Sequence, residues 1–189
     1  MNKPKEILEL EKMFNTTLNE IALVECDIDS CNCYQLGGNN EVIGLNLFGN
    51  DIVEIKGLEQ LTQLQKLFLR CNYITEIKGL EQLTQLQELD LSCNKITEIK
   101  GLEQLTQLQT LDLSENYQIT EIKGLDNLTQ LHTLYLSCNK ITEIKGLDKL
   151  VQLQSLYLQF NKITEIKGLE QLAQLQSLYL NGNLILNYS

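Results

Sequence analysis

The side chains in this sequence that could do chemistry are few, and they include six cysteines but only one histidine, His132. Catalysis by a cysteine requires a base within hydrogen-bond reach of the thiol. Cys138 comes six residues after His132, and six residues of extended strand span roughly 20 Å. We therefore expect no cysteine–histidine pair and no catalytic residue of that kind.

Three cysteines near the N-terminus, Cys26, Cys31 and Cys33, form a C-x4-C-x-C cluster. Zinc sites usually combine a C-x2–4-C pair with a second matching pair, and the fourth ligand is missing here. We expect these cysteines to pack, or to be exposed, in a loop. The sequence also contains neither G-x4-G-K-[ST] nor G-x-G-x-x-G, the common phosphate-binding motifs. It therefore predicts neither a metal site nor a cofactor.

The charge balance limits the partners that the chain can bind. The sequence has 25 acidic residues against 15 basic residues, so its net charge is −10. An acidic surface repels phosphates, which argues against nucleic acid. The N-terminus lacks the apolar segment of a secretory signal, and no stretch approaches the ~18 apolar residues of a membrane span. We expect a cytoplasmic protein with reduced thiols that does not bind membranes.

The dominant feature is an internal repeat of 22 or 23 residues with the pattern L-x-x-L-x-L-x-x-N. Its asparagines are Asn50, Asn72, Asn94, Asn116, Asn139, Asn161 and Asn183. Alternating leucines in the middle of the pattern predict a short strand with one buried face. Because the same amide recurs in every copy, we expect it to bond the backbone of its own and the adjoining repeat.

This pattern resembles the leucine-rich repeat family over residues 42–189, in seven copies of which the last is incomplete. The spacing is similar to that of the short-repeat subfamily, which includes the regulatory subunit of protein phosphatase one and the bacterial internalins. Residues 1–41, expected to form an N-terminal helical cap and a linker, resemble the entry to the repeat domain of bacterial Roco GTPases.

The resemblance and the periodicity imply an α/β leucine-rich-repeat solenoid with right-handed connections. One curved parallel sheet of about seven strands should line the concave face, with extended and 3₁₀ segments on the convex face. A helix around Glu6–Phe14 should cover the apolar edge of the first repeat. The last repeat has no visible cap, so end-to-end pairing of two copies through its strand is possible.

Residues that point outward from the strands vary in kind, whereas the convex path is nearly copied from repeat to repeat. We predict that the varied residues bind a partner protein, because aromatic residues and Arg carry much of the energy in interfaces. The predicted binding residues are Phe48, Phe68, Arg70, Asp90, Asp112, Tyr135, Tyr157, Phe160 and Tyr179. Stacking of the tyrosines could instead serve only the sheet. Asp90 and Asp112 are weak evidence for glycosidase-like chemistry, because an acidic chain has carboxylates throughout.

Cys71, Cys93 and Cys138 each precede a repeat asparagine. Cys71 and Cys93 should lie roughly 5 Å apart in adjacent repeats, within the Cα range of a disulfide. Side chains on in-register strands point the same way, however, so we expect inert thiols. The sequence thus predicts a non-catalytic protein-binding module. Two alternatives are the recognition domain of a Roco-like GTPase whose catalytic part lies beyond residue 189, and a phosphatase-regulatory subunit.

Overall fold

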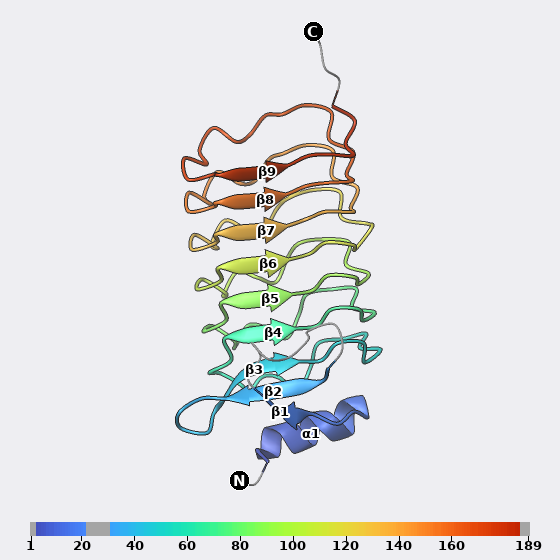
Figure 1. Cartoon of the computed structure of the whole chain (residues 1–189), viewed down its shortest axis with the longest axis vertical. Helices are drawn as coiled ribbons and strands as arrows, with labels where there is room; N and C mark the ends of the chain where they lie inside the picture. The colour runs from blue at the N-terminus through green and yellow to red at the C-terminus, as the bar shows by residue number, and fades with distance from the viewer. Residues whose placement is uncertain (1–2, 22–30, 186–189) are drawn as a thin grey trace.

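The computed structural model describes residues 3–21 and 31–185 and forms one elongated, curved stack (Figure 1). A nine-stranded sheet runs along the stack with its strands in sequence order. The strands from β3 to β9 are all parallel and in register, so that Leu67 pairs with Leu89 and Leu89 pairs with Leu111. Each repeat therefore forms one coil of a solenoid, and every coil adds one strand to the sheet.

The elements are short, as the length of one coil requires. The N-terminal elements are α1 (Lys5–Phe14), β1 (Asn19–Glu20) and β2 (Cys33–Leu36). The strands of the repeats are β3 (Val42–Asn46), β4 (Lys66–Phe68), β5 (Glu88–Asp90), β6 (Thr110–Asp112), β7 (Thr133–Tyr135), β8 (Ser155–Tyr157) and β9 (Ser177–Tyr179).

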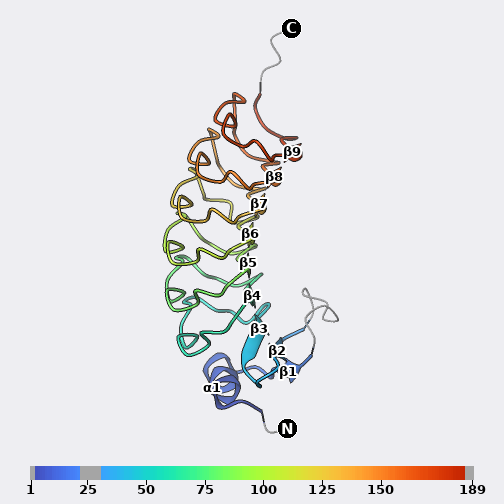
Figure 2. The same cartoon turned by 90° about the vertical axis from the view of Figure 1, so that its left-hand side faces the viewer.

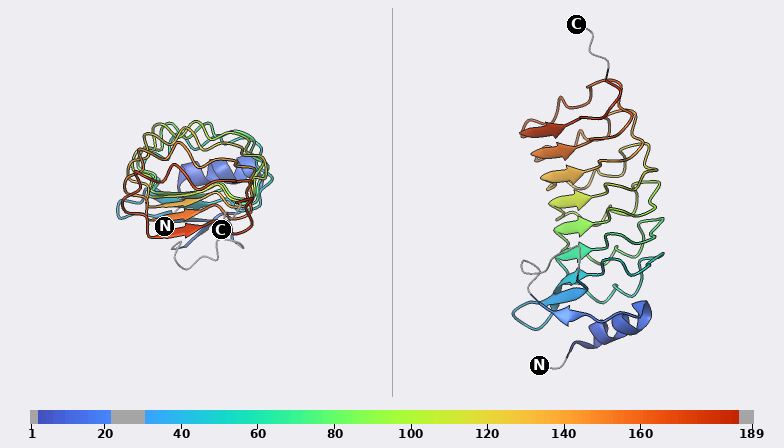
Figure 3. Two further views of the ribbon diagram at one scale, coloured as in Figure 1. Left: turned by 90° about the horizontal axis from the view of Figure 1, so that it is seen from above. Right: turned by 45° about the vertical axis from the view of Figure 1, so that its right-hand side comes forward.

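The sheet has two more strands than the sequence predicts. β1 and β2 come from the segment expected to be a linker, and β2 pairs antiparallel with β3. They cover the N-terminal edge of the sheet, while α1 lies at the end of the first coil (Figure 3). The α1 side chains Ile7 and Leu10 are buried in the common apolar core. The first repeat is thus closed by a helix and a strand together, because both its core and its strand edge need covering.

The core lies between the sheet and the return path, and it consists almost entirely of leucine and isoleucine columns. Leu89, Leu91 and Ile96 of one repeat are at most 1% exposed. The sheet lines the concave side of the bent stack and the return path forms the convex side (Figure 2). Strands pack more closely than the wider return path, which explains the bend.

The convex side is built from extended segments and single short turns of the 3₁₀ type, as the sequence predicts. In one repeat, Leu61 N donates to Leu58 O and Leu64 N donates to Leu61 O, both at 2.9 Å. These bonds join residues three apart, but within the described residues they do not continue into a 3₁₀ helix. Gly101 precedes such turns with φ of 82°, and a Cβ there would overlap Ile77 O of the preceding coil.

The repeated asparagines, called the asparagine ladder here, tie adjacent coils together. Asn94 Nδ2 donates to Leu69 O, Leu91 O and Ser92 O at 3.0–3.1 Å. Its Oδ1 accepts a bond from Ile74 N at 2.9 Å. One buried amide therefore satisfies backbone groups at a corner where neither a strand nor a helix could satisfy them.

The ladder is interrupted where the repeat is one residue longer. Tyr117 and Gln118 are exposed, Tyr117 has φ of 61°, and the core pattern resumes at Ile119. Among the described residues, Asn139 Oδ1 is buried without a hydrogen-bond partner, although the equivalent atom of Asn94 accepts a bond. The insertion is absorbed just after β6, and its cost is one ladder hydrogen bond.

Deleting Gln118 should raise the stability of the fold. The deletion returns Ile119 to the spacing at which the equivalent isoleucines donate to the ladder, and one buried hydrogen bond contributes about 1 kcal/mol. The exposed bond from Lys140 Nζ to Gln118 Oε1 is lost, at little cost. Urea unfolding should show a higher midpoint for the deletion variant. A large loss of stability would mean that the longer corner has a structural role.

Candidate functional site

Three tyrosines from adjacent strands form a continuous stack on the concave face. Tyr135, Tyr157 and Tyr179 end β7, β8 and β9, and their backbones are paired in register. The ring centroids lie 4.4 and 4.6 Å apart, with interplanar angles of 18° and 8°. This set, called the tyrosine row, results from identical rings being repeated at the strand spacing.

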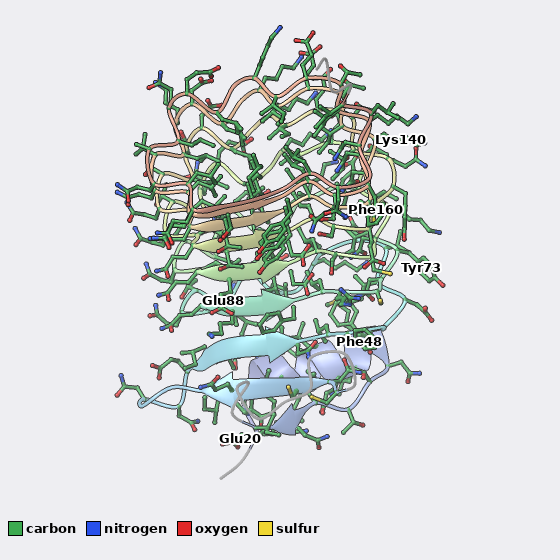
Figure 4. All side chains as sticks on the ribbon, turned by 45° about the horizontal axis from the view of Figure 1, so that its top comes forward. Glu20, Phe48, Tyr73, Glu88, Lys140 and Phe160 are labelled. Atoms are coloured by element: carbon green, nitrogen blue, oxygen red, sulfur yellow. The ribbon has the colours of Figure 1, made fainter. Side chains whose placement is uncertain are left out.

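The tyrosine row becomes more accessible toward the C-terminal end. Tyr135 and Tyr157 are half-buried, whereas Tyr179 is 42% exposed. Phe160 is 59% exposed and lies at the edge of the face where the strands end, as do Phe48 and Tyr73 (Figure 4). The Phe160 ring covers the position that a Cβ of Gly182 would occupy, so it packs on the next coil.

The N-terminal half of the face centres on Arg70, just after β4. Arg70 Nη1 donates to Ser92 Oγ at 3.1 Å, and Nη2 lies 3.8 Å from Glu115 Oε1. One side chain thus links three successive coils beside the half-buried Phe68. Ser92 and Glu115 are not among the residues predicted from the sequence, because only the structure shows that the Arg70 side chain contacts both of them.

Asn46 does not belong to the accessible surface, although the repeat pattern places it in the outward row. It is fully buried, pairs with Cys33 of β2, and accepts a hydrogen bond from Phe48 N at 3.1 Å. The cap strand covers this position, which only the three-dimensional pairing reveals. Phe48 itself is half-buried. Lys66 of β4 and Glu88 of β5 are also absent from the binding residues predicted from the sequence. They form an ion pair at 2.7 Å between the two strands.

Two carboxylates lie side by side at the centre of the face, because Asp90 of β5 pairs with Asp112 of β6. Asp112 Oδ1 accepts a bond from Ser114 N at 2.8 Å, and Asp90 Oδ1 accepts bonds from Ser92 N and Ser92 Oγ at 2.8 and 2.6 Å. Burial, and then the neighbouring charge of Asp90, raise the pKa of Asp112 to about 6. The face therefore holds an acidic centre that is unfavourable when both groups are ionised.

Replacing Asp112 by Asn should make the fold more stable at pH 7. The pKa of Asp112 is about 6 in the folded chain and about 3.9 in an unfolded one. The folded state thus binds the proton more tightly, so this group favours folding below pH 4 and loses that contribution as the pH rises through 6. We expect a gain of about 2 kcal/mol at pH 7 and little gain at pH 4. Thermal unfolding at both pH values measures the difference, and equal effects at the two would contradict the assignment.

The cysteines lie apart from the concave centre. Cys71, Cys93 and Cys138 are half-buried free thiols at the edge where the strands end. The Cys33 side chain is buried, and its Sγ lies 3.6 Å from Cys31 Sγ. The expectation of reduced thiols throughout is wrong for Cys31, which is disulfide-bonded.

Of the three clustered N-terminal cysteines, Cys26 lies outside the described residues. Within residues 3–21 and 31–185, no three His, Cys, Asp or Glu side chains are grouped so that they could hold a metal ion. His132 is half-buried and comes just before β7. No helix in the described part of the chain is long and apolar enough to cross a membrane.

A stack of coils that share one parallel sheet and one asparagine ladder defines a solenoid repeat protein. A family model for leucine-rich repeats in two copies matches residues 41–82, 84–127, 106–149, 129–169 and 151–189. The chain belongs to the leucine-rich repeat family.

Solved structures of similar shape come from internalins of Listeria monocytogenes. An internalin (inlF) superposes with a TM-score of 0.72 at 26% identity, covering 93% of this chain and 51% of the other. The functional domain of InlJ, which includes a cysteine ladder, gives a TM-score of 0.69 at 30% identity, with coverage of 92% and 36%. Internalin C2 gives 0.62 at 30% identity, with coverage of 78% and 75%.

The chain is therefore internalin-like in fold, and it spans about half or less of the first two of these proteins. A search of curated proteins finds no match.

Proposed function

We propose that this chain is a non-catalytic module that binds a partner protein on its concave face. The observation that carries the proposal is the tyrosine row, three stacked aromatic rings in the line of residues that vary between repeats. The sheet needs no tyrosine at these positions, since Asp90 and Asp112 occupy the same place in earlier strands. Aromatic rings presented together on one rigid face are typical of interface anchors.

The geometry of the tyrosine row favours a protein over a sugar or a nucleic acid. The rings cover each other's faces except at the two ends of the row, so along the row a ligand meets mainly ring edges and hydroxyl groups. Sugars and bases bind aromatic residues by lying on a ring face, and phosphates are repelled by the net charge of −10. A peptide can place apolar side chains against the ring edges and hydrogen-bond the hydroxyl groups.

The charges indicate the kind of protein segment that fits. Asp90 and Asp112 lie directly before Tyr135 in the same outward row, and Arg70 and Phe68 lie on the far side of the acidic centre. A segment with a Lys or Arg flanked by apolar residues would complement both the acidic centre and the aromatic residues around it. The cation would also relieve the unfavourable proximity of the two carboxylates.

Photo-cross-linking from single positions tests this function. A photoreactive amino acid at Ser155, on the concave strand β8, should capture one partner protein from a cell extract. The same group at Gln85, exposed on the convex side, should not capture that protein. Capture of the same protein from both positions, or only from Gln85, would contradict binding on the concave face.

A second contact proposed from the sequence is end-to-end pairing of two copies through β9. Within the described residues β9 has only β8 as a neighbour, and Leu175, Leu178 and Leu180 are partly exposed. Hydrogen exchange at Leu178–Leu180 should be faster than at Leu111–Leu113 in dilute solution, and slower at high concentration if two copies pair. Fast exchange at every concentration would exclude the pairing.

The Roco-like and phosphatase-regulatory alternatives rest on the sequence resemblance alone. The coding sequence after Ser189 discriminates between them, since a following G-x4-G-K-[ST] motif would support the GTPase.

The cellular compartment of the protein is a separate question. The sequence predicts the cytoplasm, whereas a disulfide at Cys31 is more usual in oxidising compartments. Fractionation of cells that express a tagged chain tests the prediction.

A further inference from the structure

Two thiols from adjacent coils lie near each other at the edge of the solenoid where the strands end. Cys71 and Cys93 occupy equivalent positions after β4 and β5, and both have left-handed backbones with φ of 56° and 53°. The two side chains lie close enough to interact electrostatically, and both line the same pocket. The sequence predicted parallel side chains as on a strand, but both residues lie in the corner that follows it. There the two thiols lie on adjacent coils in the same pocket.

The pair is accessible to a small molecule. Cys71 and Cys93 line a pocket of about 290 Å³ with Tyr73, Lys95 and Tyr117. The Lys95 ammonium lies 4.3 Å from the centre of the Tyr73 ring, which places a positive charge at the pocket. Glu115 also lines the pocket, so the entrance carries both signs of charge. Oxidised glutathione, which carries both ammonium and carboxylate groups, can bring its disulfide to the half-buried thiols from the solvent side without entering the pocket whole.

We propose that Cys71 and Cys93 form a reversible disulfide cross-link between coils by exchange with a small-molecule disulfide. The thiolate of Cys71 attacks oxidised glutathione, forms a mixed disulfide and releases one glutathione thiolate. The thiolate of Cys93 then attacks the Cys71 sulfur and releases the second glutathione. Two protein thiols are oxidised to one disulfide, and one molecule of oxidised glutathione is reduced to two thiols.

The order of attack follows from the surroundings of the two thiols. Burial, and then the interaction with Cys71, raise the pKa of Cys93 to about 11, so this thiol keeps its proton at neutral pH. We therefore assign the first attack to Cys71 and the second to Cys93. In the second step the attack is intramolecular between two residues of the same pocket, which compensates for the small thiolate fraction.

The cross-link would join the coils of β4 and β5 beside the N-terminal half of the concave face. It closes a loop of 22 residues, and closing a loop of this size restricts the unfolded chain substantially. Cys71 follows Arg70, whose guanidinium already spans these coils through Ser92. We expect the oxidised chain to melt several degrees higher than the reduced chain.

Cys138 is a matched control within the same chain. It has the same position in its repeat and the same φ of 56°, but the equivalent positions on either side of it are Glu115 and Phe160. It therefore has no sulfur to pair with in an adjacent coil.

The test is to incubate the full chain with oxidised glutathione and to map its disulfides by mass spectrometry. The wild type and Cys138→Ser should both yield a linked pair of peptides that contain Cys71 and Cys93, two hydrogen atoms lighter than the two free peptides together, and a reductant should separate the pair. Cys93→Ser should instead accumulate glutathione on Cys71, with no rise in melting temperature.

Three results would overturn the proposal. The first is glutathione on both Cys71 and Cys93 of the wild type without a cross-link. The second is a link from either residue to any other cysteine. The third is a folded chain in which neither thiol reacts although the urea-unfolded chain does.

Discussion

Replacing Tyr135, Tyr157 and Tyr179 together by alanine is expected to weaken binding of the partner by about 2 kcal/mol or more, roughly 30-fold in Kd. The three rings form one stacked strip, with the most accessible ring at its C-terminal end. Alanine removes both the apolar ring edges and the hydroxyl groups that a partner would contact. Titration calorimetry with the partner that Ser155 captures measures the change directly.

The same variant should still fold. The tyrosine side chains point away from the core, whereas the leucines before and after them, such as Leu156 and Leu158, are fully buried. The variant loses two ring stacks, each worth ~0.5–1.5 kcal/mol, so we expect a lower melting temperature with a cooperative transition. Loss of cooperative unfolding would show that the row is part of the folding unit, and any loss of binding could then not be assigned to contacts.

Replacing Asn94 by alanine should cost about 3 kcal/mol of unfolding free energy. The amide donates to three backbone carbonyl groups and accepts from Ile74 N, all within the buried corner of the solenoid. Alanine leaves these backbone groups without partners in a place that water reaches poorly. Urea unfolding followed by circular dichroism gives the loss.

Asn139 is the matched control for Asn94 in the ladder. Its Nδ2 donates to Leu113 O, Leu136 O and Ser137 O, but within the described residues its Oδ1 has no partner. Asn139→Ala should therefore cost about 1 kcal/mol less than Asn94→Ala, the contribution of one hydrogen bond. Equal losses would mean that the hydrogen bond from the preceding repeat contributes nothing to stability.

Much of the fold could be predicted because the same pattern of buried and exposed residues recurs in every repeat. The leucine spacing predicts both the strand and its buried face, and in-register stacking follows because each coil buries the edge of the one before it. The extra residue at Gln118 could also be placed, since the apolar pattern resumes at Ile119. These features depend on local sequence alone.

The cap could be predicted only in part, because it has no repeat to reveal its pattern. A helix ending at Phe14 is legible from its apolar spacing. β1 has only two residues, and β2 becomes a strand by pairing with β3. The burial of Asn46 is a consequence of that pairing. Elements that exist through tertiary contact leave little signal in the sequence.

The candidate site likewise combines features that the local sequence predicts with features that arise only from tertiary contacts. The rows of outward-facing residues could be predicted from the alternation of buried and exposed positions along each strand. The ring stacking, the raised pKa of Asp112 and the proximity of Cys71 to Cys93 depend on the distances and burial that the coil spacing creates. The left-handed backbone at the two cysteines places them in the corner after the strand, which the strand pattern before them does not indicate.

The central claim, that binding occurs on the concave face, is tested most directly by comparing two triple variants in one binding measurement. One carries alanine at the tyrosine row, and the other carries alanine at the exposed convex residues Gln63, Gln85 and Gln107. If the partner binds on the concave face, the tyrosine variant should lose roughly 30-fold in affinity, and the glutamine variant should bind like the wild type. Weaker binding by the glutamine variant together with unchanged binding by a folded tyrosine variant would contradict it.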